Sequence, residues 1–289
     1  MILSKILRLL RIHQYIKNVF LFLPLFFGLE ILNFELLIQV LFAFLAFSIT
    51  ASSIYILNDF KDLEKDRLHP TKKFRPLASN EVSVNFAIKL FFILAIFGHS
   101  IMSLISLDAF IILNIYFLIN IAYIYKLKNI PILDVSLISL GFVIRLFLGA
   151  VIGDIELSNW IVLMTFLLAL FISLAKRRDD VLIYNNTKIK SRKVIDNYNL
   201  KFLDVSITVI SSVLLVSYIM YITSFGKDEN LDNGYLYLTI FFVILGVLRY
   251  LKIIFVDESS GSPTKTLLKD TFLQFTVFAW IITFYLFLY

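Results

Sequence analysis

The sequence contains no cysteine, and it has only three histidines, at positions 13, 69 and 99. Without cysteine the chain forms no disulfide, no iron–sulfur cluster and no catalytic thiolate, and histidines this scattered argue against a histidine metal site. Charged residues are scarce as well, at 17% of the chain, and nucleic acid is not expected as a partner. The few charged residues are therefore the candidates for chemistry.

Apolar residues, in contrast, dominate the chain. They make up 60% of its 289 residues, including 30 phenylalanines, and the mean hydropathy is +0.87. A soluble core of this length cannot bury so many apolar side chains, so the bilayer must serve as the solvent. The basic N-terminal segment lacks a small-residue cleavage site after its first apolar stretch, so we expect the first span to remain in the mature protein.

Spans of about 20 apolar residues are needed to cross a bilayer core about 30 Å thick. Nine segments meet this requirement approximately, although the first contains Pro24 and the sixth is short. The expected spans are residues 17–32, 35–57, 85–104, 108–125, 132–153, 160–175, 204–224, 235–255 and 270–289. We therefore predict an all-α polytopic bundle of about nine transmembrane helices, which forms one integral membrane domain over residues 1–289.

The basic residues indicate how this bundle is oriented. Lysine and arginine gather on the cytoplasmic side of membrane proteins, and 25 of the 27 basic residues fall in segments that alternating spans place on one side. The exceptions are Lys227, in an outer connection, and Arg145, inside a span. We predict a cytoplasmic N-terminus in the inner (plasma) membrane, with the chemistry on the cytoplasmic polar stretches 58–84 and 176–203.

The most informative motif is an acidic run that follows the second span. Asp59, Asp62 and Asp66 are separated by three and four residues, so a continuing helix would place them on one face, which Asn58, four residues before Asp62, would join. Like charges on one face repel, and a divalent cation would compensate them. Mg²⁺ favours oxygen ligands and commonly shares one or two carboxylates with substrate phosphates. The run predicts a Mg²⁺-dependent diphosphate site with these four residues as ligands, although a solvated charged loop is the alternative.

Basic residues at the same membrane face are candidates for binding the phosphate groups. Lysine and arginine are the side chains that bind phosphate oxygens, but at span ends they are also ordinary topology signals. Convergence on one face favours the binding interpretation. The residues expected to bind substrate are Lys17, Asn58, Lys72, Lys73, Arg75, Tyr125, Lys126, Lys176 and Arg177.

The fifth span adds two charged residues, Asp134 near its start and Arg145 eleven residues deeper. Eleven residues are close to three helical turns, so both lie on one face, about 16 Å apart along the axis. An arginine at this depth is costly unless it faces protein or water. Both residues are therefore predicted to contribute to substrate binding, with an anionic lipid head group as the partner of Arg145; snorkelling or a structural ion pair is the alternative.

The acidic run on the second of nine spans resembles the first acidic motif of the UbiA superfamily of intramembrane prenyltransferases. The resemblance implies a nine-helix bundle in which two acidic motifs on cytoplasmic loops hold Mg²⁺ and a prenyl diphosphate. At the place of the second motif this chain instead reads Lys176-Arg-Arg-Asp-Asp180. This departure puts in doubt a second Mg²⁺ site of the usual kind and an ordinary prenyl diphosphate donor.

Within the superfamily, several separated strings are similar to the decaprenyl-phosphate phosphoribosyltransferases. These strings are Asp66-Arg-Leu-His-Pro-Thr-Lys-Lys-Phe-Arg-Pro76, Pro131-Ile-Leu-Asp134, Gly141-Phe-Val-Ile-Arg145, Lys176-Arg177, Arg249-Tyr250 and Gly261-Ser-Pro263. The resemblance implies transfer of 5-phosphoribose from 5-phosphoribosyl 1-diphosphate to a polyprenyl phosphate, for cell-envelope polysaccharide precursors. Asp59, Asp62 and Asp66 would then be catalytic through Mg²⁺.

Two other functions remain open from the sequence. The first acidic motif alone also fits a prenyltransferase that moves a prenyl group from its diphosphate to an aromatic or glycerol-phosphate acceptor. A transporter or lipid-binding membrane protein would use the charged loops for topology only. The sequence leaves the oligomeric state open.

Overall fold

The computed structural model of the chain describes residues 2–69, 71–188, 192–225, 235–258, 261 and 263–288. These residues form helices and connecting turns with no strand, which confirms the all-α prediction. Eight of the helices are long and apolar enough to cross a membrane. The chain divides into two compact units. The first comprises Met1–Leu137 and Gly141–Leu157, and the second comprises Ile138–Leu140 and Ser158–Tyr289.

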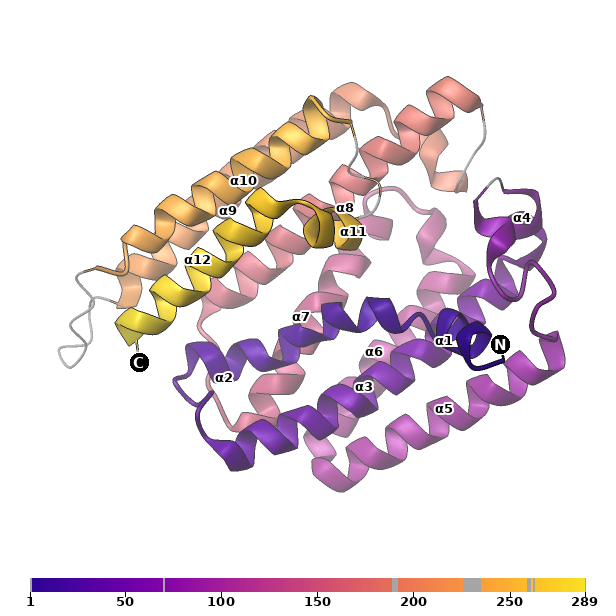
Figure 1. Cartoon of the computed structure of the whole chain (residues 1–289), viewed down its shortest axis with the longest axis horizontal. Coiled ribbons are helices and arrows are strands. Elements are labelled where there is room, and N and C mark those ends of the chain that lie inside the picture. The colour runs from indigo at the N-terminus through magenta and orange to yellow at the C-terminus, as the bar shows by residue number, and fades with distance from the viewer. Residues whose placement is uncertain are drawn as a thin grey trace. The chain divides into compact units, whose positions relative to one another are not determined.

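Helix α3 is the central element of the first unit, where it packs against α1, η1, α5 and α6 (Figure 1). Side-chain caps fix where helices begin. Asn33 accepts a hydrogen bond from the Leu36 amide at the start of α3, and Ser106 caps α6 in the same way. The elements are α1 (Ile2–Leu10), η1 (Ile12–Phe22), α2 (Leu23–Phe27), α3 (Phe34–Lys61), α4 (Leu63–Leu68), η2 (Lys72–Phe74), α5 (Val84–Ile105), α6 (Leu107–Tyr125), η3 (Leu127–Asn129) and α7 (Leu133–Gly153).

Small residues bring the backbones of this unit together. A methyl group added at Gly98 of α5 would lie 2.8 Å from the Ala46 carbonyl oxygen of α3, and one added at Gly149 of α7 would overlap the Leu21 carbonyl oxygen of η1. Such close approach is how helices associate inside a membrane, where lipid is as apolar as leucine. Outward-facing residues of α5, in contrast, are large and apolar: Ile96 is 67% exposed.

The first expected span, residues 17–32, differs from the prediction because it is not one long helix. It is covered by the 3₁₀ helix η1 and the short helix α2, after which Leu29 has a positive φ of 62°. Pro24 has no N–H and so interrupts any α-helical hydrogen-bond ladder through this segment. Side-chain bonds to α3 hold η1 instead, since Tyr15 contacts Ser52 and Asn18 donates to Ser48, each at 2.8 Å.

In the second unit α8 packs against α9, α9 against α10, and α10 against α12 (Figure 1). The elements are α8 (Asn159–Thr187), η4 (Lys193–Asn197), α9 (Leu200–Phe225), α10 (Leu238–Phe255), α11 (Pro263–Lys269) and α12 (Thr271–Leu288). Helix α8 extends beyond the expected end at residue 175, so Lys176 and Arg177 lie in a helix and not in a loop. The outer connection with Lys227, as well as Ser262 of the string Gly261-Ser-Pro263, lie outside the described residues.

Asp270, between α11 and α12, provides a test of this unit. It accepts hydrogen bonds from the Leu273 amide at 2.9 Å and from Arg249 Nη2 at 2.6 Å. The Arg249 guanidinium holds the pKa of Asp270 below its ordinary value, so the ion pair stabilises the fold above about pH 4 and is lost as pH falls through the lowered pKa. Asp270→Asn keeps a capping side chain but removes the charge.

We expect Asp270→Asn to lower the thermal unfolding temperature at pH 7, and this deficit to shrink below about pH 4. Unfolding of the purified protein in detergent, followed by intrinsic fluorescence across pH, measures the difference from the parent protein. A deficit that does not change with pH would show that the charge on Asp270 is not what stabilises this turn.

Candidate active site

The acidic run lies where α3 ends. Asp62 is the residue between α3 and α4, with φ −97° and ψ 8°; its amide donates to the Asn58 carbonyl, and its own carbonyl accepts from the Asp66 amide. Asp59 and Asp66 are buried, at 2% and 4% exposure, whereas the Asp62 side chain is 22% exposed. The chain turns at Asp62, so the run does not continue as the single helical face that its spacing predicts.

Two arginines from other segments pair with the buried carboxylates. Arg75 Nη1 is 3.0 Å from Asp59 Oδ1 and 2.6 Å from Asp66 Oδ2, so one nitrogen bridges both side chains. Arg11, which has a left-handed backbone with φ 54°, also pairs with Asp59 and lies over the Tyr55 ring. Asp59 and Asp66 are thus arranged around a single position for a cation.

Asp62 has a different partner. Lys128, on the turn η3 after α6, places its Nζ 2.8 Å from both carboxylate oxygens of Asp62 and 3.4 Å from Asn58 Oδ1. The three carboxylates are therefore neutralised by three cations of the same unit. Neutralisation removes the repulsion that the sequence spacing creates, without any bound ion.

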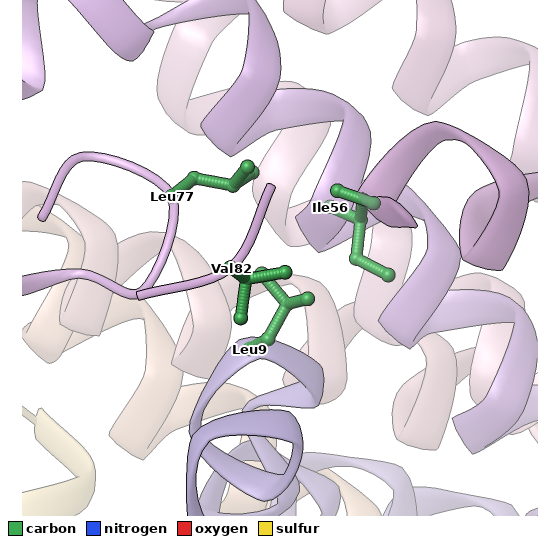
Figure 2. Packing of buried hydrophobic residues seen from close by; sticks show 5 residues of the cluster. Leu9, Ile56, Leu77 and Val82 are labelled. Atoms are coloured by element: carbon green, nitrogen blue, oxygen red, sulfur yellow. The ribbon is translucent and has the colours of Figure 1, made fainter. Parts of the chain in front are cut away.

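An apolar cluster fixes the two arginines in place. Leu9 of α1, Ile56 of α3, and Leu77 and Val82 of the connection before α5 converge, together with Ala87 (Figure 2). Leu9 precedes Arg11 by two residues and Leu77 follows Arg75 by two, while Ile56 is three residues before Asp59. Packing of this cluster therefore brings segments distant in sequence to one carboxylate.

Leu77→Ala tests the cluster without changing any charge. We expect it to cost about 2–4 kcal/mol of stability, because Leu77 is 1% exposed and its removal leaves a cavity. Activity should fall as well, since Arg75 loses its support. The matched control is Leu68→Ala, at a leucine that is 87% exposed on α4. Equal unfolding temperatures and equal turnover for the two variants would contradict the positioning role.

The other basic candidates of this region lie on its surface. Lys73 is exposed with its ammonium 5.2 Å from the Phe74 ring, and Lys72 is half-buried on η2. Tyr125 ends α6 with its ring 4.8 Å from Lys61 Nζ. Lys126 follows it and is exposed. Phosphate binding by these residues stays a prediction.

Arg145 and Asp134 of α7 are both buried, at 5% and 0% exposure. Arg145 donates to Asn18 Oδ1 at 2.8 Å, to the Gly141 carbonyl at 2.6 Å and to the Tyr116 hydroxyl at 3.2 Å. It therefore faces protein, as an arginine at this depth must, and it is not paired with Asp134. Lys17 precedes Asn18 on η1 and is half-buried.

Lys176 and Arg177 belong to the second unit. Arg177 is 1% exposed and pairs with Asp180, while Arg178 donates to Asp204 Oδ1 at 2.7 Å and to the Ile254 carbonyl at 2.9 Å. Both arginines are thus partly neutralised by acids, in place of the free cationic cluster that the sequence suggests. A role for Lys176 and Arg177 in phosphate binding stays a prediction.

The acidic end of α3 fits Mg²⁺ by its donor chemistry. Among the described residues no three aspartate, glutamate or histidine side chains already converge as a complete metal cage. Mg²⁺ needs only one or two carboxylates when substrate phosphates and water supply its other ligands. Asp59 and Asp66, which share one Arg75 nitrogen, would hold it in place of that nitrogen, with Asn58 and Asp62 beside them.

No sequence pattern singles out Arg11 or Lys128 as site residues. Arg11 reads as part of a basic N-terminus and Lys128 as a topology signal, because their acidic partners are 48 and 66 residues away in the chain. Asn18 and Tyr116, which hold Arg145, carry no charge and stand in apolar stretches. The packing of the helices is what identifies these four residues, Arg11, Asn18, Tyr116 and Lys128, as part of the site.

Comparison with known proteins agrees with this geometry. The model of the UbiA prenyltransferase family matches residues 21–282. The chain is 30% identical to the decaprenyl-phosphate phosphoribosyltransferase of Corynebacterium glutamicum, over 95% of this chain and 84% of that protein. It is 32% identical to the protein of the same name from Mycolicibacterium smegmatis, over 96% and 90% of the two chains.

Among solved structures, a UbiA homolog from Archaeoglobus fulgidus bound to DMAPP and Mg²⁺ matches with a TM-score of 0.72 at 19% identity, over 98% of each chain. This similarity concerns the fold, and it agrees with the eight apolar helices of a multi-pass membrane protein. The family model matches about nine-tenths of the chain. This match confirms the resemblance to the UbiA superfamily that the acidic run indicates. The chain belongs to the UbiA prenyltransferase family of membrane transferases.

Proposed function

We propose that the protein transfers 5-phosphoribose from 5-phosphoribosyl 1-diphosphate to a polyprenyl phosphate and releases diphosphate. The observation that carries the proposal is the similarity, over nearly the whole chain, to two proteins named decaprenyl-phosphate phosphoribosyltransferase. The buried carboxylates with their arginine partners support it, because they offer both a metal-binding pair and cations for phosphate oxygens. The product would serve the synthesis of cell-envelope polysaccharide precursors.

The carboxylates and the arginines at the end of α3 would have different roles in binding the donor. Asp59 and Asp66, with Asn58 and Asp62, would hold Mg²⁺, which supplies positive charge to the diphosphate leaving group. Arg75 and Arg11 would then donate to phosphate oxygens, for which the planar guanidinium is well suited. These side chains would stabilise the charge that builds on the diphosphate as its bond to the ribose anomeric carbon breaks.

The acceptor needs little activation. Its phosphate oxygen is already anionic near neutral pH and would form the new bond to the oxocarbenium-like anomeric carbon, so no strong general base is required. Lysines and arginines of the first unit would share the 5-phosphate and the lipid phosphate: Lys17, Lys72, Lys73, Arg75, Lys126 and Arg145. Lys176 and Arg177 of the second unit are further candidates for phosphate binding. Tyr125 and Asp134 would help to position these groups. The site would face the cytoplasm, with the N-terminus inside.

Membranes that contain the overexpressed protein test the reaction directly. They are incubated with polyprenyl phosphate, Mg²⁺ and 5-phosphoribosyl 1-diphosphate labelled in the ribose, and in parallel with a prenyl diphosphate and an aromatic or glycerol-phosphate acceptor, and the lipids are then extracted. We expect label in a phosphoribosyl lipid, dependent on both the lipid phosphate and Mg²⁺. Absence of labelled lipid, with consumption of a prenyl diphosphate instead, would overturn the proposal.

A second candidate is transfer of a prenyl group from its diphosphate to an aromatic or glycerol-phosphate acceptor. Solved UbiA homologs from Archaeoglobus fulgidus, bound to DMAPP and Mg²⁺ or to GPP and Mg²⁺, share the fold and favour this reaction. The assay above separates the two candidates by which diphosphate is consumed. The non-enzymatic alternative is not retained, because the family is one of transferases.

A further inference from the structure

Arg145 carries a buried charge that no described carboxylate neutralises. All three of its hydrogen-bond acceptors are neutral groups: the Asn18 amide, the Gly141 carbonyl and the Tyr116 hydroxyl. Rings of Phe47, Tyr116 and Phe142 lie within 4.7 to 5.3 Å of its guanidinium carbon. A guanidinium has five N–H donors, so these bonds orient the side chain and leave donors for a ligand.

Lys17 is the neighbour in sequence of Asn18, which accepts a hydrogen bond from Arg145. It is half-buried, and it makes no hydrogen bond or ion pair with the part of the chain that the structure describes. Unpaired cations at membrane depth cost several kcal/mol. A structure that gathers them there, instead of burying apolar side chains, indicates a site for an anion.

This cationic pair is separate from the acidic end of α3. Asn18 contacts Ser48, which is eleven residues before Asp59 on α3 and therefore about 16 Å deeper along the helix. Tyr15 contacts Ser52, about 10 Å from Asp59 by the same measure. Along α3 the two places are therefore about 10–16 Å apart, which is longer than one diphosphate group.

We propose that Lys17 and Arg145 form a second anion site in the first unit, which binds a phosphate monoester while the carboxylates of α3 handle the diphosphate. The site deepens the function proposed above and rests on it, because both of its substrates carry a phosphate monoester: the donor at its 5-position and the lipid acceptor at its head. An ordinary prenyl diphosphate would place its apolar chain at this depth. Such a chain offers no negative charge to pair with Lys17 and Arg145.

Asn18 and Tyr116 are positioning residues of this site. Asn18 accepts from Arg145 with its oxygen and donates to Ser48 with its nitrogen, so it ties the guanidinium to α3. The Tyr116 ring packs against Phe47 at 4.5 Å and directs its hydroxyl to Arg145. Together they hold a cation in a fixed orientation before any ligand arrives, as recognition of a phosphate requires.

Binding of small probes to the purified full-length protein in lipid nanodiscs tests the second site apart from turnover. Ribose 5-phosphate represents the donor monoester and farnesyl phosphate represents the lipid head, with farnesol as the neutral reference. We expect one of the two phosphates to bind, and Lys17→Met to weaken that binding about tenfold or more, since a hydrogen bond to a charged group is lost. Lys17→Arg should restore most of it.

Matched variants make the result decisive. Lys89→Met, at an exposed lysine on α5, should leave binding unchanged, and Asp59→Asn should retain binding of the monoester because the diphosphate site is elsewhere. The phosphate that binds identifies the source of the monoester. The proposal is overturned if neither phosphate binds better than farnesol, if Lys17→Met binds like the parent, or if Asp59→Asn weakens monoester binding as much as Lys17→Met does. Failure of the transfer reaction itself would appear only in the labelled-lipid assay.

Discussion

Asp59→Asn is expected to lower turnover by at least about a hundredfold, the loss typical when a preorganised electrostatic group is removed from a site. Asparagine keeps the shape of the side chain but loses the charge that pairs with Arg11 and Arg75. Asp66→Asn should behave similarly, because Asp66 shares the same Arg75 nitrogen. Asp62→Asn should cost less, since its more exposed carboxylate pairs with Lys128 alone.

Turnover is measured with purified protein across a range of Mg²⁺ concentrations, and thermal unfolding checks that each variant is folded. Asp108→Asn, an exposed carboxylate in the first turn of α6, is the matched control and should leave both quantities unchanged. A folded Asp59→Asn protein with normal turnover and normal Mg²⁺ dependence would show that the end of α3 is not part of the active site.

Gly149→Ala is expected to prevent correct folding, the largest stability effect that we predict from a single methyl group. The added Cβ would overlap the Leu21 carbonyl oxygen, which is backbone and cannot rotate away as a side chain would. Overpacking of side chains typically costs 1–3 kcal/mol, and a clash with backbone lies at or above the upper end of that range. Helix α7 and η1 would have to separate.

Gly246→Ala is the control for this substitution. It also adds a methyl group to a glycine inside an apolar helix, but the nearest atom, Thr276 Oγ1, would be 3.5 Å away in ordinary contact. We expect unchanged or slightly higher stability there, because alanine is a better helix former than glycine. Size-exclusion profiles in detergent and unfolding temperatures measure both variants. A monodisperse Gly149→Ala protein with the parent unfolding temperature would contradict the close approach.

Hydropathy was sufficient to predict most of the fold, because spanning helices are long, apolar and internally hydrogen-bonded. It failed at residues 17–32, where Pro24 and the polar contacts of Asn18 favour a 3₁₀ segment over a regular helix. It also did not indicate that α8 continues as a helix beyond the expected end of the sixth span. Arg177 continues α8 as a helix by pairing with Asp180 one turn later, and hydropathy does not register that interaction.

The site was predictable only where it is local in sequence. Asp59, Asp62 and Asp66 stand out by their spacing, and Arg145 stands out because an apolar span contains it. Arg11 depends on contacts across 48 residues, which packing decides and no motif encodes. The apolar cluster at Leu77 that supports this arrangement resembles any other hydrophobic segment until α1 and α3 are brought together.

The pairing of the three carboxylates with Arg11, Arg75 and Lys128 also affects how a donor first meets the protein. With those charges cancelled, the long-range field around the end of α3 is set by the remaining side chains, and between Lys61 and Lys73 these are five basic residues and one acidic residue, Glu64. A polyanionic donor is therefore attracted to this end from a distance and not repelled by the aspartates. Its association rate should fall as ionic strength rises and the field is screened.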